Sequence, residues 1–260
     1  MTFRELLDVP FALVQANLPA LAVLSAATFV LAELLVVAVT VGVSSMTDGS
    51  DAATAWAAVL STACCAWLMR LVLRGTTVAI GLASIAGAPI GWRAALGRLG
   101  ARIGPLLIFQ LLYTTVGLGI LALSVPLIIT FPFGVVWLAW LRAKRFVVVP
   151  VVFAERASHR TAAARSKLLA AGAEWSVVGL WFVQRFLLGL LCVPLLGIPW
   201  YLSDFSGTHR WQVIVLLTGG ALLIVAFGEV VEAATRVVSY VDRRCRREGA
   251  DIRIPGQERR

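Results

Sequence analysis

The sequence predicts an all-α, polytopic membrane bundle of six transmembrane helices joined by short amphipathic helices on the cytoplasmic side. Hydrophobic residues make up 60% of the 260 residues and charged residues only 14%. Soluble domains contain about 45 to 50% apolar residues. In addition, the apolar residues form blocks at least as long as the ~20 residues that cross a bilayer. Composition and block length therefore agree on an integral membrane protein.

Six apolar blocks define the predicted spans. They are Leu18 to Val43, Ala53 to Ala83, Ile103 to Ile129, Phe133 to Ala154, Trp175 to Leu202 and Trp211 to Val241. The first block lacks a convincing small-residue cleavage site, so we expect it to remain in the protein as a membrane helix. We expect one membrane domain over residues 1–242 and a basic cytoplasmic tail over residues 243–260.

The distribution of Lys and Arg predicts the orientation. Residues 44–52 and 130–132 contain no Lys or Arg, and residues 203–210 contain one. The opposite set of connections and both ends of the chain hold most of the basic residues, for a net charge of +9. Cytoplasmic loops carry the excess of positive charge in membrane proteins. Both termini are therefore predicted to be cytoplasmic.

A short internal repeat precedes two of the predicted hairpins. Arg93 and Arg98 have the same spacing as Arg160 and Arg165, with an alanine two residues after the first arginine in both groups. The lead from Phe3 to Asn17 occupies the equivalent place before the first span. This periodicity favours three units, each with an amphipathic helix and a transmembrane hairpin.

The connecting helices have one apolar face. At 100° per residue, Trp92, Leu96 and Leu99 share a stripe of roughly 60°, whereas Arg93 and Arg98 point elsewhere. Such a helix lies in the membrane plane with its arginines toward anionic headgroups. Either these charges only set the topology, or they contact anionic lipid or a protein partner. Nucleic acid is not an expected partner, because the basic tail has no stacking aromatics beyond Tyr240.

Charged residues within the last two spans predict an ion pair. Arg185 lies about ten residues into the fifth span, at nearly the depth of Glu229, and Glu232 is one turn further along the same helix face. A short connection makes these helices neighbours, so we expect Arg185 to pair with Glu229 or Glu232. Glu33, near the middle of the first span, has to find a cation, a hydrogen-bond donor or a proton.

Two interpretations of the buried charges remain open. They either hold helices in register as structural ion pairs or line a polar cavity that opens to the cytoplasm. Arg142 and Arg145 are three residues apart, so on a continuous helix they share a face and can hold one anion. The same residues also suit the inner membrane interface. The candidates for the cavity are Glu33, Arg70, Arg74, Arg142, Lys144 and Arg145.

Catalytic and metal-binding motifs are missing from the sequence. It contains no GxxxxGK[ST], HExxH or GxSxG pattern. The four cysteines form no CxxC pair, and only two histidines accompany them. We therefore expect no enzymatic activity, no metal and no cofactor.

Four segments resemble a known group of membrane proteins. They are residues 6–21, residues 75–99, the run VPVVFAERASHRTAAARSKLL at residues 149–169 and the ending YVDRRCRREGADI at residues 240–252. Together they resemble the membrane domain that accompanies glycerophosphoryl diester phosphodiesterases and similar six-helix membrane proteins of actinobacteria. The resemblance implies a bacterial plasma-membrane protein, and we expect it to lack the catalytic phosphodiesterase domain of the fused relatives. An Arg to Lys ratio of 21 to 2 also agrees with a high-GC bacterial source.

The favoured functional hypothesis is a non-catalytic scaffold or accessory subunit. Its basic cytoplasmic face would contact anionic lipid or a protein partner. The residues predicted for this face are Arg93, Arg98, Arg102, Glu155, Arg160, Arg165, Ser166, Asp242, Arg243 and Arg246. The alternative is a small-solute or lipid transporter that uses Arg185, Glu229, Glu33, Arg142 and Arg145.

Overall fold

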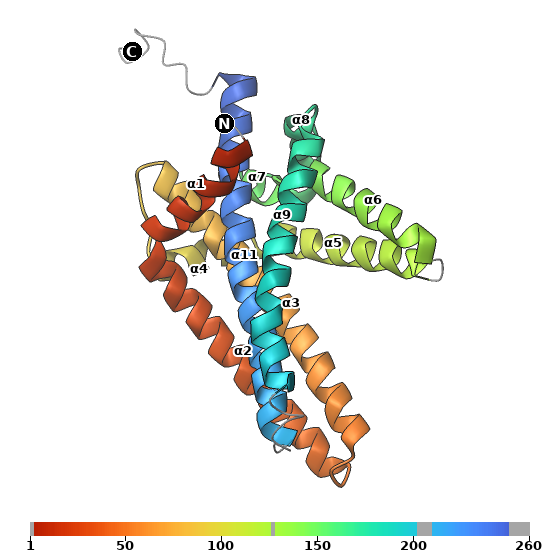
Figure 1. The fold of residues 1–260 in the computed structure, drawn as a ribbon. Coiled ribbons are helices and arrows are strands. Elements are labelled where there is room, and N and C mark those ends of the chain that lie inside the picture. The colour runs from red at the N-terminus through yellow and green to blue at the C-terminus, as the bar shows by residue number, and fades with distance from the viewer. Residues whose placement is uncertain (1–2, 126–127, 202–209, 250–260) are drawn as a thin grey trace.

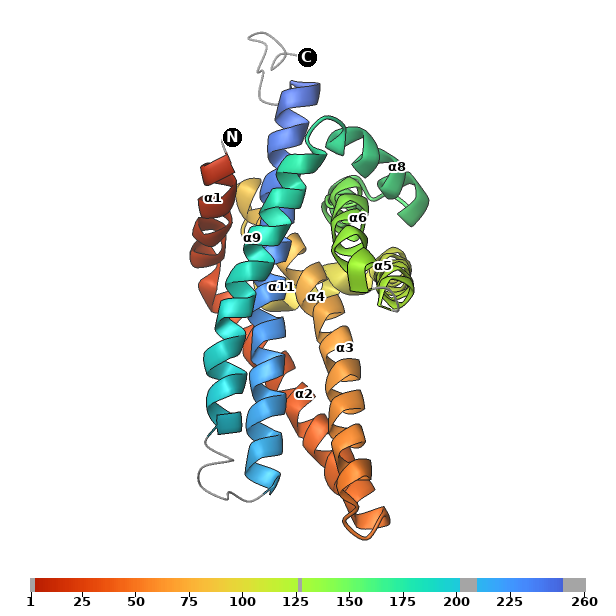
Figure 2. The same ribbon diagram turned by 45° about the vertical axis from the view of Figure 1, so that its right-hand side comes forward.

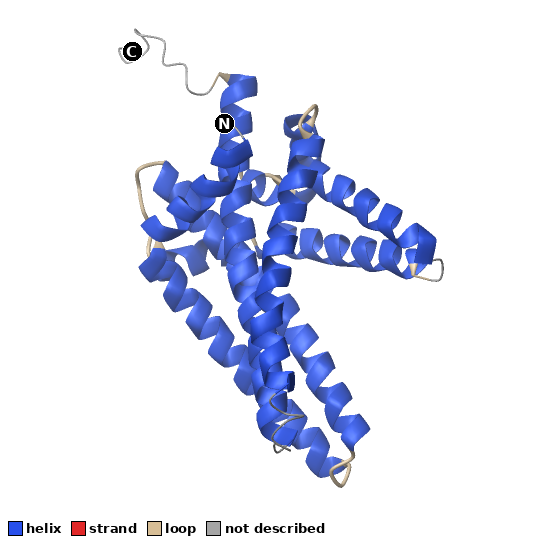
Figure 3. Cartoon of the chain, in the orientation of Figure 1, coloured by secondary structure: helices blue, strands red, loops and turns tan. Residues whose placement is uncertain are grey.

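The computed structural model describes residues 3–125, 128–201 and 210–249, and these residues form helices and turns without a strand (Figure 3). The short helices are α1 (Phe3–Ala16), α4 (Trp92–Gly100), α6 (Phe131–Lys144), α7 (Val148–Ala154), α8 (His159–Ala170) and the 3₁₀ turn η1 (Ile128–Thr130). The longer helices are α2 (Leu18–Met46), α3 (Asp51–Ile85), α5 (Ile103–Ser124), α9 (Glu174–Cys192), which continues into the π-helical turn η2 (Val193–Gly197), and α11 (Arg210–Glu248).

The core of the molecule surrounds the C-terminal half of α11. Every residue of α11 from Gly228 to Tyr240 is buried, although isolated amphipathic helices bury only one stripe. Helices α1, α3, α7, α8 and α9 all contact α11 and cover its different sides. This part of the molecule is therefore a helical body in which α11 is the central element.

Two long hairpins extend from this body in the same direction (Figure 1). One consists of α2 and α3, joined by a tight turn in which Asp48 and Gly49 adopt φ of 48° and 78°. The other consists of α9 and α11. Large apolar side chains such as Leu31, Leu60 and Phe186 are more than 60% exposed on these hairpins. Such an apolar surface is what a helix in lipid presents, whereas in water it would favour aggregation.

The third hairpin, α5 and α6, has a different direction. It projects sideways from the body and crosses the direction of α11 at a wide angle, and Figures 1 and 2 agree on this. Leu106 and Phe109 near the start of α5 are buried in the body, and Leu138 and Ala139 of α6 are buried as well. The outer part of α5 is apolar and exposed, as at Leu118 and Leu123.

Among the described residues, five helices are long and apolar enough to cross a membrane, which indicates a multi-pass membrane protein. The sequence predicted six. The predicted fourth span, Phe133 to Ala154, is wrong because α6 ends at Lys144 and α7 begins at Val148. Helix α6 has 14 residues and is only ~21 Å long, too short for a 30 Å hydrocarbon core. The break falls at the basic residues Arg142, Lys144 and Arg145.

The order of elements has one short helix before each hairpin. Helix α1 precedes α2 and α3, α4 precedes α5 and α6, and α8 precedes α9 and α11. Helix α11 extends to Glu248, beyond the predicted domain boundary at residue 242, and residues 250–260 of the predicted tail lie outside the described part of the chain.

The π-helical turn η2 lies close to α11. Pro194 within this turn cannot donate a backbone hydrogen bond, and one extra residue per turn accommodates the interruption. A Cβ atom on Gly220 of α11 would lie 2.7 Å from the backbone oxygen of Leu195. Glycine at position 220 therefore allows the two backbones to approach.

Candidate functional site

Arg74 and Glu229 form a buried, two-bond ion pair between α3 and α11. Arg74 Nε donates to Glu229 Oε1 at 2.5 Å, and Arg74 Nη2 donates to Oε2 at 2.9 Å. Arg74 Nη1 also donates to Gln110 Oε1 of α5 at 2.5 Å. Parallel bonds of this kind fix the orientation of a guanidinium and a carboxylate. The pair therefore locks three helices together at one level of the body.

Glu232, one turn further along α11, accepts hydrogen bonds from two arginines. Arg185 Nη2 of α9 lies 2.6 Å from Glu232 Oε2, and Arg236 Nη2 lies 2.5 Å from Oε1. The predicted pairing of Arg185 with Glu232 is confirmed. Its alternative partner, Glu229, is instead bound by Arg74. Both carboxylates of the predicted site are thus fully engaged by arginines.

Arg142 has a different environment. Its guanidinium lies 4.2 Å from the ring centroid of Tyr113 and 5.7 Å from that of Trp181. Its Nε is buried without a hydrogen-bond partner, and no carboxylate of the described residues forms an ion pair with it. A Cβ atom on Gly117 would lie 2.9 Å from Arg142 Nη2, so Gly117 leaves the space that this guanidinium occupies.

We define the arginine cluster as Arg70, Arg74, Arg142, Arg185 and Arg236 together with Glu229 and Glu232. Five guanidiniums here face two carboxylates, which leaves an excess of three positive charges. Aromatic rings offset part of this excess. Arg236, for example, lies 5.4 Å from the Phe146 ring and 5.8 Å from the Tyr113 ring. Cation–π contacts are weaker than an anionic partner, so the cluster is electrostatically suited to an anion.

Two neighbouring cavities give access to the arginine cluster. The first has a volume of about 340 Å³ and is lined by Arg70, Arg74 and Arg142. The second, about 250 Å³, is lined by Arg70 and Arg185 together with both carboxylates. Arg70 lines both cavities, its side chain is 41% exposed, and its Nε is 3.9 Å from Glu229 Oε2. Its loose pairing leaves most of its hydrogen-bonding capacity available.

The other predicted cavity residues lie elsewhere. Glu33 of α2 accepts a hydrogen bond of 2.8 Å at Oε1 from Thr218 of α11, whereas its Oε2 is buried without a hydrogen-bond partner. Lys144 lies over the ring of Trp140 at 3.2 Å. Arg145 is exposed just beyond the end of α6. The prediction that Arg142 and Arg145 share a face is wrong, because the helix ends between them.

Residues of the predicted cytoplasmic face form a network of ion pairs and hydrogen bonds at the C-terminal end of α11. Arg165 of α8 pairs with Glu155 at 3.5 Å and also contacts Glu248 of α11. Tyr240 donates to Glu155 at 3.1 Å, and Arg244 pairs with Glu248 at 3.0 Å. These contacts join α8 and the end of α7 to α11. Glu155 and Arg165 are therefore largely engaged within the chain.

Two residues predicted for this face are buried. Ser166 is 0% exposed and donates to the backbone oxygen of Lys144 at 3.0 Å, which anchors α8 to the end of α6. Arg243 is 7% exposed. Their assignment to an exposed contact face is wrong, because both side chains point into the body.

The remaining basic residues of the face are accessible. Arg93 is exposed and lies over the ring of Trp92 at 4.9 Å, Arg160 is exposed, and Arg102 is partly exposed. Arg246 pairs with Asp242 at 3.1 Å on the surface of α11. Exposed basic residues of the predicted face therefore remain on α4, on α8 and at the C-terminal end of α11.

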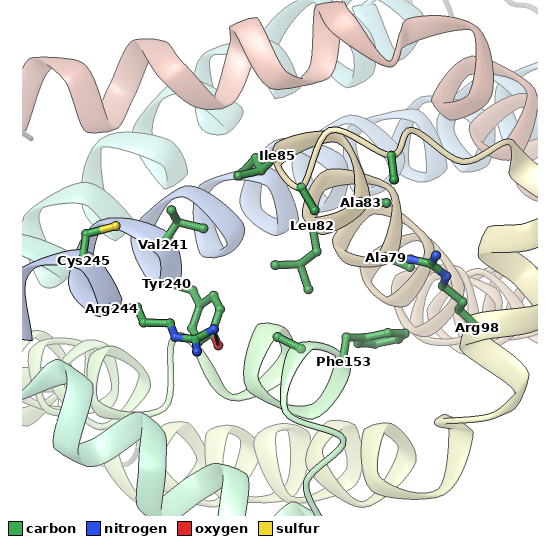
Figure 4. Close-up of a pocket in the computed structure, with 13 residues that line it drawn as sticks. Ala79, Leu82, Ala83, Ile85, Arg98, Phe153, Tyr240, Val241, Arg244 and Cys245 are labelled. Atoms are coloured by element: carbon green, nitrogen blue, oxygen red, sulfur yellow. Dashed lines mark hydrogen bonds between the residues drawn. The ribbon is translucent and has the colours of Figure 1, made fainter. Parts of the chain in front are cut away.

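A third cavity, of about 480 Å³, lies between α3, α7 and α11. Arg98 and Arg244 lie at opposite ends of it, and Tyr240 and Phe153 form part of its wall (Figure 4). Its floor consists of small residues of α3 such as Ala79 and Ala83. Arg98, predicted as a lipid contact, therefore borders a hollow as well as the outer surface.

Three residues of the site were not singled out from the sequence. Gln110 and Tyr113 of α5 meet the arginines only because α5 enters the body, and no local pattern signals this. Arg236 could have been found, because it follows Glu232 by four residues on one helix face.

Cysteines and possible metal ligands are dispersed. Cys64, Cys65, Cys192 and Cys245 are all free thiols. Within the described residues, no group of three or more His, Cys, Asp or Glu side chains is placed to hold a metal ion.

Comparison of the chain with known protein families, with curated proteins and with solved structures finds no match. The resemblance to the membrane domain associated with glycerophosphoryl diester phosphodiesterases therefore stays a prediction.

Proposed function

We propose that this chain is a transporter of an anionic small solute or lipid in the bacterial plasma membrane, with both termini in the cytoplasm and three units of short helix plus hairpin. Arg142 carries the proposal. It is an arginine without a carboxylate partner among the described residues, and it lines a cavity beside Arg70 and Arg74. A buried guanidinium donor without a partner, such as Arg142 Nε, is costly, and a charged residue at membrane depth commonly marks a ligand or substrate pathway.

The position of the cluster along the helices supports this proposal. Glu229 is 18 residues from Trp211, the start of the apolar part of α11, or about 27 Å at 1.5 Å per residue. Because the hydrocarbon core is ~30 Å thick, the arginines lie close to the inner boundary of the bilayer. An anion from the cytoplasm or from the inner leaflet would meet the cluster at this level.

The proposal is tested with the full chain in proteoliposomes. Two probes are used, radioactive inorganic phosphate for uptake and a fluorescent phosphatidylglycerol for movement between leaflets. Loss of one charged hydrogen bond costs about 1.5 to 3 kcal/mol, so we expect Arg142→Gln to lower the active probe's rate at least tenfold. Arg93→Gln, an exposed arginine on α4, is the matched control. Wild-type rates equal to those of empty liposomes for both probes would overturn the proposal.

A second candidate function is the scaffold that contacts anionic lipid or a partner without transport. The exposed basic surface of α4 favours it, because Trp92 and Leu96 are exposed next to Arg93 and Arg98. Neutralising Arg93 and Arg98 together should then weaken capture of anionic liposomes by the protein in detergent micelles, whereas Arg142→Gln should not. No change in capture on neutralising the pair would remove this candidate.

A further inference from the structure

A groove of about 390 Å³ runs between α1, α9 and α11 and is apolar along most of its wall. Leu7 and Phe11 line it from α1, Leu187 and Leu191 from α9, and Phe227 from α11. One part of its wall is polar, because Arg185, Gln184 and Glu232 also line it. The groove is thus amphipathic, with a charged region beside an apolar one.

The groove adjoins the arginine cluster. Arg185, Leu188, Gly228 and Glu232 line both the groove and the 250 Å³ cavity, and Arg70 lines that cavity as well. Arg185 Nη2 is held by Glu232, yet its side chain is 31% exposed. Gln184 donates to Thr235 at 2.6 Å, while its Oε1 is buried without a partner. Hydrogen-bonding capacity therefore remains at the junction of groove and cavity.

We propose that this groove binds one anionic phospholipid, with an acyl chain against α1 and α9 and the phosphodiester between Arg70 and Arg185. This proposal rests on the proposed function and names its substrate class. A free anion would leave the apolar wall of the groove uncovered, and a zwitterionic lipid would not compensate the excess of guanidiniums. A planar guanidinium binds phosphate oxygens through two parallel bonds.

The depth of this junction in the membrane agrees with a bound phospholipid. Glu232 is one turn from Glu229 along α11, so it also lies near the inner boundary of the hydrocarbon core. Arg185 lies at the same level because it pairs with Glu232. Lipid phosphates of the inner leaflet lie just beyond this boundary. A lipid can therefore place its headgroup at the arginines while its chain stays at the depth of the groove.

The test measures lipid binding to the purified full chain in detergent by native mass spectrometry and thermal shift. The probes are phosphatidylglycerol, phosphatidylcholine with the same chains, and inorganic phosphate. We expect phosphatidylglycerol to bind at least tenfold more tightly than phosphatidylcholine. Arg185→Gln should abolish this preference, and Leu191→Trp should weaken phosphatidylglycerol binding by filling the groove. Leu123→Trp, at an exposed position of α5 that lines none of these cavities, is the control for added bulk.

Two outcomes would overturn the proposal. One is equal affinity for the two lipids, and the other is unchanged phosphatidylglycerol binding in Leu191→Trp. If phosphatidylglycerol does not bind but phosphate uptake still depends on Arg142, the lipid assignment fails and the proposed transport function stands. If neither probe is moved in proteoliposomes while the lipid still binds selectively, the transport proposal fails and the binding site stands.

Discussion

Arg74 and Glu229 are 155 residues apart in the chain and meet through two hydrogen bonds of 2.5 and 2.9 Å. Both side chains are 3% exposed. Removing one partner of such a pair leaves an uncompensated buried charge, whereas replacing both by apolar residues often costs little. Single and double substitutions of this pair can therefore distinguish a structural role from a functional one.

Glu229→Leu should destabilise the protein by about 3 to 5 kcal/mol, because Arg74 is left buried without its carboxylate. The double variant Arg74→Met with Glu229→Leu should recover most of this loss. Thermal unfolding in mild detergent measures both. A single variant as stable as the wild type would contradict the view that the pair holds α3 and α11 together.

Gly220→Ala should lower the unfolding free energy by about 1 to 3 kcal/mol, because the new Cβ would lie 2.7 Å from the Leu195 backbone oxygen. Gly119→Ala in α5 is the matched control, since a Cβ there has no atom within 4 Å. That control should be neutral, or stabilising by up to ~1 kcal/mol through helix propensity. Equal effects of the two substitutions would argue against the close approach of η2 and α11.

Thr218→Val should destabilise the protein by about 1 to 3 kcal/mol, because Thr218 supplies the hydrogen bond that the structure shows to Glu33. In a Glu33→Leu background the same substitution should cost clearly less, since no carboxylate remains to be satisfied. A double-mutant cycle of thermal unfolding isolates this coupling. Additive effects would show that the hydrogen bond contributes nothing.

We expect His159, which lies outside the candidate membrane spans, to make the stability of the folded protein depend on pH. Burial lowers the pKa of His159 below its ordinary value, and the charge of Arg145 lowers it further. The unfolded chain then binds a proton at higher pH than the folded chain does. The contribution of neutral His159 to the stability of the folded state is therefore fully present above its ordinary pKa, about 6.5. This stability is lost as the pH falls toward the folded-state pKa.

His159→Gln should accordingly flatten the dependence of the unfolding temperature on pH just below pH ~6.5, the ordinary pKa of histidine. The measurement compares wild type and variant from mildly acidic to neutral pH in one buffer series. Identical slopes for the two proteins would exclude His159 as the titrating group.

The ends of most long helices could be predicted because hydropathy and turn residues are local signals. Leu18 begins α2 as expected, and Asp48 with Gly49 forms the turn at its end. The division between α6 and α7 was missed because the apolar run continues past Lys144. Length alone does not reveal that the helix stops there.

The contacts of the candidate site likewise include some that the sequence could predict and others that it could not. Arg185 and Glu232 could be paired from sequence, because neighbouring helices joined by a short connection place residues of equal depth side by side. Arg74 and Glu229 could not be paired, because α3 and α11 are distant in sequence and their meeting depends on how the helices pack in the body.

By itself the sequence determined that this protein is helical and enters a membrane, since apolar composition and block length are properties of the chain that packing does not alter. Only the tertiary structure decided that α5 and α6 lie across the other hairpins and that five arginines gather around two glutamates. The reason is physical: the partner of a buried charge and the direction of a hairpin are fixed by long-range contacts, which leave no local pattern in the sequence.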